Sequence, residues 1–558
     1  MMLRIKKFIK FLKSGLFLVL VVSLVLILSC AIYAQQTPIK EKIIRVAQSW
    51  PCYIDPAVGQ DNVSAIANIN LYEQLVMLDE KGEIAPKVAK SWDFNSTSNT
   101  YTFHLVEGIK FHNGDILTSN DVIFSLERLL TIGEGWSFLF KNVVGEYSAP
   151  DPETVVISLK QSYGPFLSIL IHLHILNEKQ VISNIKKDGL YGEFGDYGKG
   201  WLVTHDAGSG PFMVEEMKTA EYLYAVRFLD YWGGWEKDAP DSFKLIGTTE
   251  PVTVRTLMSR NQLEITDEWQ PTENYEVLGK IPGIEVVYFN AGGVLYLGFN
   301  TSKPPLDDVY FRRALMYIFD YETCHEKIYP TGKRTNGPVG SALPGWDSTL
   351  PYLERDVKKA KMELAQSKYA DQLDNYPVEF AWVSEVPDLE KVALLLQSNA
   401  SEIGIKIEVT KNPWLTMVAI TASAESTPHI FTEIKTSIPY PEAGALLEGG
   451  YHSTGRGTFA NVHWFTDEIQ RELDQLIEET LSTADNIERY AKYSAMTKRI
   501  IDLASDIWAV EIPQRHAYHA DYVVWPDADA AKAGQKIHIM PGQRMYFKDM
   551  KFVLEKMP

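Results

Sequence analysis

Apolar residues recur along the chain at two spacings, and together these predict a mixed α/β protein. Tyr101, Phe103 and Leu105 alternate with polar residues, which is typical of a half-buried strand. Thr118 and Asp121 then form a capping-box pattern, and the apolar residues that follow recur at helical spacing. We therefore expect a strand followed by an amphipathic helix in this part of the chain.

The segment 378–409 gives the clearest indication of topology. Both of its ends alternate as strands, and the stretch between them has one apolar helical face, with Gly404 where a C-terminal cap would stand. A strand, a helix and a strand of these lengths predict a right-handed βαβ crossover and hence a parallel sheet. Two further amphipathic helices are expected, one from Ile469 to Leu481 and one from Asn486 onwards.

The first 34 residues have the organisation of a secretory signal peptide. Five basic residues precede an apolar run from Leu16 to Leu28, and small residues follow. A membrane-spanning helix needs about 20 apolar residues, and this run is shorter, so we expect export with cleavage. Two alternatives remain for how the signal is processed. One is cleavage after Ala34, and the other is lipidation of Cys30 in a lipobox-like Ile-Leu-Ser-Cys motif. Either one leaves the mature chain in the periplasm or on the extracytoplasmic face of the membrane.

Composition narrows the class of partner. The 558 residues carry a formal charge of −18, which becomes −23 once the five positive charges of the leader are removed. Such a surface repels nucleic acid and anionic lipid, so we expect no nucleic-acid partner and membrane contact only through a possible lipid anchor. Cys52 and Cys324 are far apart in the sequence, and we expect two buried, unpaired thiols rather than a disulfide framework.

A search for chemical motifs predicts neither catalysis nor a cofactor. The chain has no Walker-type phosphate loop, dinucleotide glycine fingerprint, H-E-x-x-H or C-x-x-C motif. The closest histidine pairs, His172 with His174 and His516 with His519, lack the additional ligands that a metal site needs. We therefore expect no catalytic residue, no metal and no cofactor.

Several sequence blocks stand in a fixed order and spacing along the chain. The early blocks are Tyr72-Glu73-Gln74-Leu75-Val76, Gly82-Glu83-Ile84-Ala85-Pro86, Ala89-Lys90-Ser91-Trp92, Gly108-Ile109-Lys110-Phe111-His112-Asn113-Gly114 and Asp121-Val122-Ile123-Phe124-Ser125. The later blocks include Gly210-Pro211-Phe212, Asp230-Tyr231-Trp232-Gly233-Gly234 and Tyr296-Leu297-Gly298-Phe299-Asn300. In this order and spacing the blocks resemble extracellular solute-binding protein family 5, which includes the dipeptide- and oligopeptide-binding proteins of ABC importers. The resemblance covers nearly the whole mature chain.

The resemblance implies a two-lobed periplasmic-binding-protein-like α/β fold (type II, cluster C-like) with an extra inserted subdomain. The two lobes would close over the ligand about a hinge. Lobe I would be discontinuous and lobe II continuous. The expected boundaries are 40–77, 195–292 and 510–558 for lobe I, 78–194 for the subdomain inserted in lobe I, and 293–509 for lobe II.

The resemblance also indicates where the ligand binds. In peptide-binding members an aspartate holds the ligand's α-ammonium, and the corresponding stretch here ends at Tyr440. By alignment Ser437 takes the place of that aspartate, and a neutral hydroxyl cannot balance a buried ammonium. Glu433 is an alternative anchor, although Lys435 could already neutralise it. We therefore expect all four side chains near the ligand, and the stretch favours a ligand that is uncharged or differently charged.

Aromatic residues complete the expected site. The chain holds 13 Trp and 28 Tyr, whose flat apolar faces and polar tips suit sugars or peptide side chains. Trp414 matches a family tryptophan that lines the binding site, and Trp50 and Tyr53 lie in the early loop that approaches it. A purely structural role in the core is the alternative for each.

The predicted function is that of the substrate-binding component of an ABC importer. We expect a monomer that binds a peptide or a related small solute and docks on the permease subunits of the importer. An oligosaccharide is the alternative ligand within the same family. A secreted glycan hydrolase would be a different class, which the missing nucleophile and metal motifs disfavour.

Overall fold

The computed structural model describes residues 1–3, 41–49, 52–79, 82–435 and 438–558. The chain divides into two compact units, and the unit from Ile43 to Lys556 contains all the sheets. Cys30, Trp50 and Ser437 lie outside the described residues, as does almost all of the predicted signal peptide. Within the described ranges, no helix combines the length and the apolar character needed to cross a membrane.

One layer, here called the first sheet, is assembled from distant parts of the chain. Four strands lie in the order β1-β12-β11-β10, with β1 parallel to β12 and the other neighbours antiparallel. Ile265 bridges Val46 of β1 on one side and Tyr518 of β19 on the other, and β19 pairs with β13. The strands are β1 (Ile43–Gln48), β10 (Phe212–Lys218), β11 (Tyr222–Arg227), β12 (Ser242–Gly247), β13 (Ile284–Phe289) and β19 (Gln514–His519).

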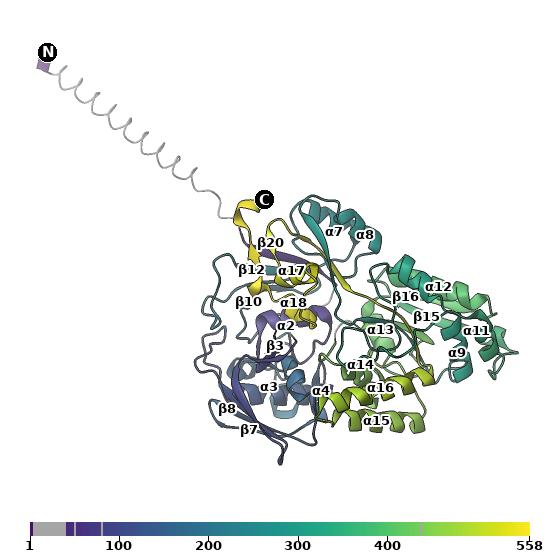
Figure 1. The fold of residues 1–558 in the computed structure, drawn as a ribbon. Coiled ribbons are helices and arrows are strands. Elements are labelled where there is room, and N and C mark those ends of the chain that lie inside the picture. Colours follow the sequence, from purple (N-terminus) through teal and green to yellow (C-terminus); the bar gives the residue numbers. More distant parts are fainter. Residues whose placement is uncertain (4–40, 50–51, 80–81, 436–437) are drawn as a thin grey trace. The chain divides into compact units, whose positions relative to one another are not determined.

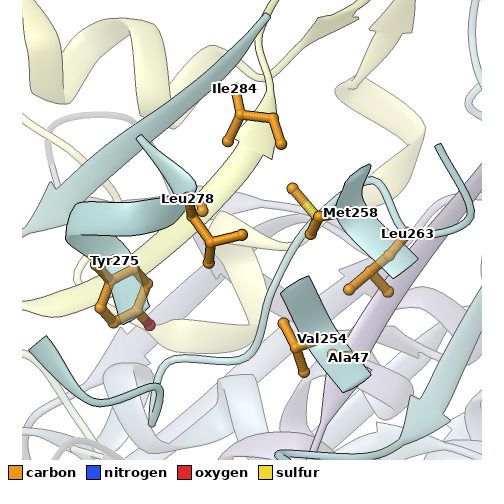
Figure 2. Packing of buried hydrophobic residues seen from close by; sticks show 8 residues of the cluster. Ala47, Val254, Met258, Leu263, Tyr275, Leu278 and Ile284 are labelled. Atoms are coloured by element: carbon orange, nitrogen blue, oxygen red, sulfur yellow. The ribbon is translucent and has the colours of Figure 1, made fainter. Parts of the chain in front are cut away.

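Two helices, α7 (Pro251–Ser259) and α8 (Thr272–Leu278), close an apolar core against the first sheet. Val254 and Met258 of α7 and Tyr275 of α8 pack with Ala47 of β1, all of them at most 3% exposed. Figure 2 shows the side chains converging from these elements. Burial of apolar area at about 25 cal/mol per Å² therefore fixes the segment 263–278 on this sheet.

A separate antiparallel sheet, in the order β5-β6-β8-β7, lies between 89 and 159 in the sequence. Helix α3 (Ser119–Ile132) begins with the capping box formed by Thr118 and ends at Gly133 in the left-handed conformation, at φ +72°. The strand and helix predicted here are therefore confirmed. The strands are β5 (Ala89–Asn95), β6 (Thr100–Leu105), β7 (Val144–Asp151) and β8 (Thr154–Leu159).

The second sheet has the order β16-β15-β17-β14-β18. β15 runs parallel to both β16 and β17, while β14 is antiparallel to β17 and β18. Helix α12 (Asp388–Ser401) connects β15 to β16, and Gly404 takes φ +83° after it, so the predicted βαβ unit is confirmed. The strands are β14 (Val294–Phe299), β15 (Val378–Val383), β16 (Ile407–Asn412), β17 (Ile430–Lys435) and β18 (Asp506–Glu511).

Helices surround the second sheet. The two predicted amphipathic helices are confirmed as α15 and α16, which lie side by side (Figure 1). Cys52 and Cys324 are buried and unpaired, as expected. The helices used below are α2 (Asn62–Leu71), α9 (Val309–Ile318), α13 (Trp414–Ile420), α14 (Ala443–Tyr451), α15 (Asp467–Leu481), α16 (Asn486–Leu503) and α18 (Pro541–Arg544).

The chain passes between the first and second sheets twice. β13 ends at Phe289 and β14 begins at Val294, while β18 ends at Glu511 and β19 begins at Gln514. Phe289 pairs with Gln514 and Val294 pairs with Glu511. The two crossings therefore run side by side, which is the covalent arrangement that a hinge requires. The lobe boundaries given above stay a prediction.

Candidate ligand-binding site

Several strands of the second sheet begin or end at the edge that faces the crossings. Because β15, β16 and β17 are parallel, their carboxyl ends meet at this edge, where β14 begins and β18 ends. Ligands of α/β sheets bind outside the carboxyl ends of the strands. Glu385 follows β15, Trp414 follows β16 and Lys435 ends β17. This second-sheet edge therefore brings predicted site residues from different strands to one side of the sheet.

Trp414 is held by its backbone and is only half-buried. Its N–H donates to both carboxylate oxygens of Glu385, at 3.0 and 3.1 Å. Its ring lies edge-on to Phe459, with 4.9 Å between the centroids. Because the main chain is anchored and part of the ring is open, the indole can stack on a bound molecule without its backbone moving.

Glu433 and Lys435 form a buried pair on β17. Lys435 Nζ lies 3.5 Å from Glu433 Oε2, donates a 2.9 Å hydrogen bond to the carbonyl of Ala460, and lies 4.5 Å from the centroid of the Tyr296 ring. Burial raises the pKa of Glu433, and the nearby Lys435 ammonium opposes that shift. The carboxylate thus already has a cationic partner, as the sequence suggested.

Tyr440 is fully buried and bonds to a carboxylate that also binds a segment distant in the sequence. Its hydroxyl donates to Glu448 Oε2 of α14 at 2.8 Å, and the same oxygen accepts from Tyr163 at 3.0 Å. Burial raises the pKa of Glu448. Next to it, His172 Nε2 lies 2.6 Å from the carbonyl of Pro439. In this conformation Tyr440 therefore serves a contact within the protein.

The first-sheet edge carries a polar group that the sequence analysis did not select. β1 ends at Gln48, β19 begins at Gln514, and the strand-like residues around Ile265 run on into Glu268, so all three lie at the edge that faces the crossings. Asn62, at the start of α2, donates from Nδ2 to Glu268 Oε1. A pair of acids, Asp267 and Glu268, directly after an alternating apolar and polar stretch at 263–266 was the available signal in the sequence.

Several atoms of this group have no partner. Glu268, Gln514 and Gln48 are each 4% exposed. Among the described residues no hydrogen-bond partner exists for Glu268 Oε2, Asn62 Oδ1, or the Nε2 atoms of Gln514 and Gln48. Burial raises the pKa of Glu268 to about 7, opposed by the Arg544 guanidinium and by the neighbouring side chains of Asn62 and Gln514. Buried polar groups in native proteins are nearly always satisfied, so this edge is suited to an external partner.

Tyr53 lies in the loop between β1 and α2 and remains 39% exposed. Its backbone N–H donates to Ser64 Oγ at 3.0 Å, which holds the loop against the first turn of α2, close to Asn62. The structure therefore brings Tyr53 to the region of the first-sheet edge, and Trp414, Glu433 and Lys435 to the second-sheet edge. In the part of the chain that the structure describes, no three histidine, cysteine or acidic side chains converge as a metal site would require.

Comparison with known proteins agrees with this architecture. Residues 83–457 match the model of the bacterial extracellular solute-binding proteins, family 5 Middle. A probable D,D-dipeptide-binding periplasmic protein of Escherichia coli K12 is 27% identical over 479 residues, which cover 84% of this chain and 88% of that protein.

Solved structures show the same fold. An ABC transporter-associated periplasmic binding protein from Helicobacter pylori, in complex with the peptide STSA, aligns with a TM-score of 0.78 at 19% identity, covering 91% of this chain and 98% of that one. AgaA from A. tumefaciens R10, in complex with agropinic acid, gives 0.75 at 20% identity, with 91% and 98% covered. These likenesses confirm the two-lobed α/β fold. The chain belongs to family 5 of the bacterial extracellular solute-binding proteins, the substrate-binding components of ABC importers.

Proposed function

We propose that the protein binds a peptide, or a related small solute, between the first-sheet and second-sheet edges and delivers it to the permease subunits of an importer. The observation that carries this proposal is that the ends of strands from both sheets meet at the two crossings. There, a half-buried tryptophan stands on one edge, and buried polar atoms without a partner among the described residues stand on the other. The peptide names of the E. coli and H. pylori relatives support this ligand class.

The same proposal covers the boundaries of the lobes. Lobe I comprises 40–77, 195–292 and 510–558, with the inserted subdomain at 78–194, and lobe II comprises 293–509. Each of the larger sheets draws its strands from within one of these parts, apart from the last two residues of β18, which suggests that the second crossing lies at 512–513. Closure about the crossings would bury the ligand and change the surface presented to the permease.

We also propose that the chain is exported and acts as a monomer without catalysis. Intact-mass analysis of protein from the native envelope is expected to show a mature form that begins near Gln35 or at a lipidated Cys30. A chain that retains Lys6 and Lys7 would contradict export. Incubation with peptides and glycans, followed by mass spectrometry, is expected to yield no products, and any cleavage would favour a hydrolase.

The ligand class is tested by a binding panel of free di- to tetrapeptides, their N-acetylated forms and short neutral oligosaccharides. A solute that binds only the folded protein raises the melting temperature by mass action. We expect peptides to produce that shift and to reduce the radius of gyration in solution scattering. Binding of sugars alone would replace the peptide proposal by the oligosaccharide alternative, and a bound solute without compaction would contradict hinge closure.

A further inference from the structure

We propose that Glu268, together with Asn62 and Gln514, forms a subsite on the first-sheet edge for the ammonium group of the solute. This inference rests on the proposed function, since it assigns one chemical group of the peptide to one place in the site. The sequence places an anchor on the second sheet, at Ser437 or Glu433. The structure instead points to the opposite edge, where Glu268 Oε2 has no hydrogen-bond partner among the described residues.

Two carboxylates at the second-sheet edge are already engaged. Glu433 has Lys435 at 3.5 Å. Both oxygens of Glu385 accept the backbone N–H of Trp414. Next to the proposed subsite, both oxygens of Asp267 accept hydrogen bonds, one from a backbone amide at 2.8 Å and one from a glutamine side chain at 2.5 Å. An ammonium group would have to displace an existing partner at each of these, whereas Glu268 Oε2 has none among the described residues.

The polar atoms of Glu268, Asn62 and Gln514 that lack partners complement the amino-terminal end of a peptide. An ammonium carries three N–H donors and no acceptor, and Glu268 Oε2 with Asn62 Oδ1 supplies two buried acceptors on side chains that are already hydrogen-bonded to each other. Gln514 Nε2 is a buried donor beside the Glu268 carboxyl group, and it completes no hydrogen bond in the described part of the chain. It matches the carbonyl oxygen that stands next to the ammonium in a peptide and not in a simple amine. The group therefore favours a solute with an amino-terminal peptide unit.

The charged surroundings of Glu268 leave room for a cation. Arg544 of α18 is the positive group that lowers its pKa, and Asp267 is the negative group that raises it. His516 of β19 is uncharged near neutral pH because burial lowers its pKa to about 4. Arg544 donates from Nη1 to the carbonyls of His538 and Ile539, and its Nη2 makes no hydrogen bond among the described residues, Glu268 included. Burial therefore dominates, and a buried carboxylate without a close partner gains strongly from a hydrogen-bonded cation.

The experiment is calorimetry at pH 6.5 in two buffers of different ionisation enthalpy, with free di- to tetrapeptides and their N-acetylated counterparts. At this pH a peptide amine, with a pKa of about 8, is charged. Glu268, with a pKa of about 7, is mostly protonated before binding. We expect free peptides to bind with release of most of one proton, and to bind on the order of tenfold to a hundredfold more tightly than the acetylated forms.

Two variants separate the subsite from its surroundings. Glu268→Gln is expected to abolish proton release and to remove the preference for free amines. Asp267→Asn, at a neighbouring carboxyl whose oxygens are both engaged, is expected to keep the preference for free amines and to release a smaller fraction of a proton, because the Asp267 charge raises the pKa of Glu268. The wild-type measurement stands even if a variant fails to fold. Free and acetylated peptides that bind equally well, without proton release, would overturn the subsite and leave peptide binding intact. Binding of neutral sugars only would overturn the subsite and the peptide proposal together.

Discussion

The two edges that face the crossings treat their buried acids differently. On the second-sheet edge Glu433 lies 3.5 Å from Lys435, and the lysine is further held by a carbonyl and a tyrosine ring. On the first-sheet edge Glu268 shares one oxygen with Asn62 and leaves the other without a partner among the described residues. A buried acid that is paired can be retained without loss of folding free energy. A buried acid without a partner lowers the stability of the protein until a ligand supplies that partner. The difference separates a structural group from one available to a ligand.

Removal of Lys435 gives the strongest test of the paired side. Lys435→Met is expected to lower the free energy of unfolding by about 3–5 kcal/mol, because it leaves Glu433 buried without a counter-ion. Urea denaturation at pH 8 without solute measures this change. The matched control is Glu433→Gln, which is expected to cost less because Lys435 keeps its hydrogen bond to the Ala460 carbonyl and its contact with the Tyr296 ring. The loss should shrink at low pH as Glu433 becomes protonated. Equal stabilities of Lys435→Met and wild type would show that the pair is not structural.

Removal of the acid on the unpaired side should act in the opposite direction. Because the pKa of folded Glu268 is about 7, above the usual value of about 4.3, its contribution to stability is fully present below pH 4 and is lost as the pH rises through 7. Glu268→Gln is therefore expected to stabilise the solute-free protein by up to about 3 kcal/mol at pH 8, with little change at pH 4.

Urea denaturation of Glu268→Gln and wild type at several pH values measures this effect. A destabilised variant at pH 8 would mean that Glu268 is structurally paired, for example through Arg544, and the contrast between the edges would fail. The same variant should bind free peptides more weakly, so stability and affinity are expected to change in opposite directions at this residue.

The sequence predicts the second sheet better than the first, because the residues that identify the strands and helix of the second sheet lie close together in the sequence. The strands and helix of the βαβ unit lie within 35 residues of one another, and their periodicities survive in β15, α12 and β16. The first sheet depends on partners that no short window contains. Asn62 and Glu268 are 206 positions apart, and Gln514 reaches the same edge only after the second crossing.

Side-chain roles were harder to predict than strands. The family motif places Tyr440 near the ligand, which stays a prediction, and the structure adds a hydrogen bond from its hydroxyl to Glu448, eight positions later. The turn into α14 brings the two together, and periodicity contains no information on that turn. Trp414 is placed near the ligand by its match to a family tryptophan, and its position directly after β16 agrees with that, since the carboxyl end of a parallel strand lies at the edge where ligands bind.

Trp414 tests whether the second-sheet edge contributes directly to binding. Trp414→Ala is expected to weaken solute binding by about 1–3 kcal/mol, as for loss of one well-packed aromatic contact. The stability of the solute-free protein should change little, because the backbone N–H that bonds Glu385 remains. Calorimetry and urea denaturation separate the two quantities. Trp414→Phe, which keeps an aromatic face, should recover part of the affinity. Lost stability with retained affinity would assign the ring to the core.

The contact between Tyr163 and Glu448 gives the smallest expected effect and concerns closure. Tyr163 lies in the segment proposed as the inserted subdomain and Glu448 in α14, so their hydrogen bond joins parts that would separate on opening. Tyr163→Phe removes one of the two tyrosine donors to this carboxylate and is expected to weaken solute binding by about 1 kcal/mol. Calorimetry measures the affinity, and solution scattering should still show compaction.

Tyr440→Phe is the matched control for this last prediction. It removes the other donor to the same oxygen, but both of its groups belong to the proposed lobe II. Its loss should therefore lower the free energy of unfolding and affect affinity less than Tyr163→Phe does. If the two variants weaken binding equally, the contact does not distinguish open from closed protein, because only a bond that is broken on opening contributes to the balance between those states.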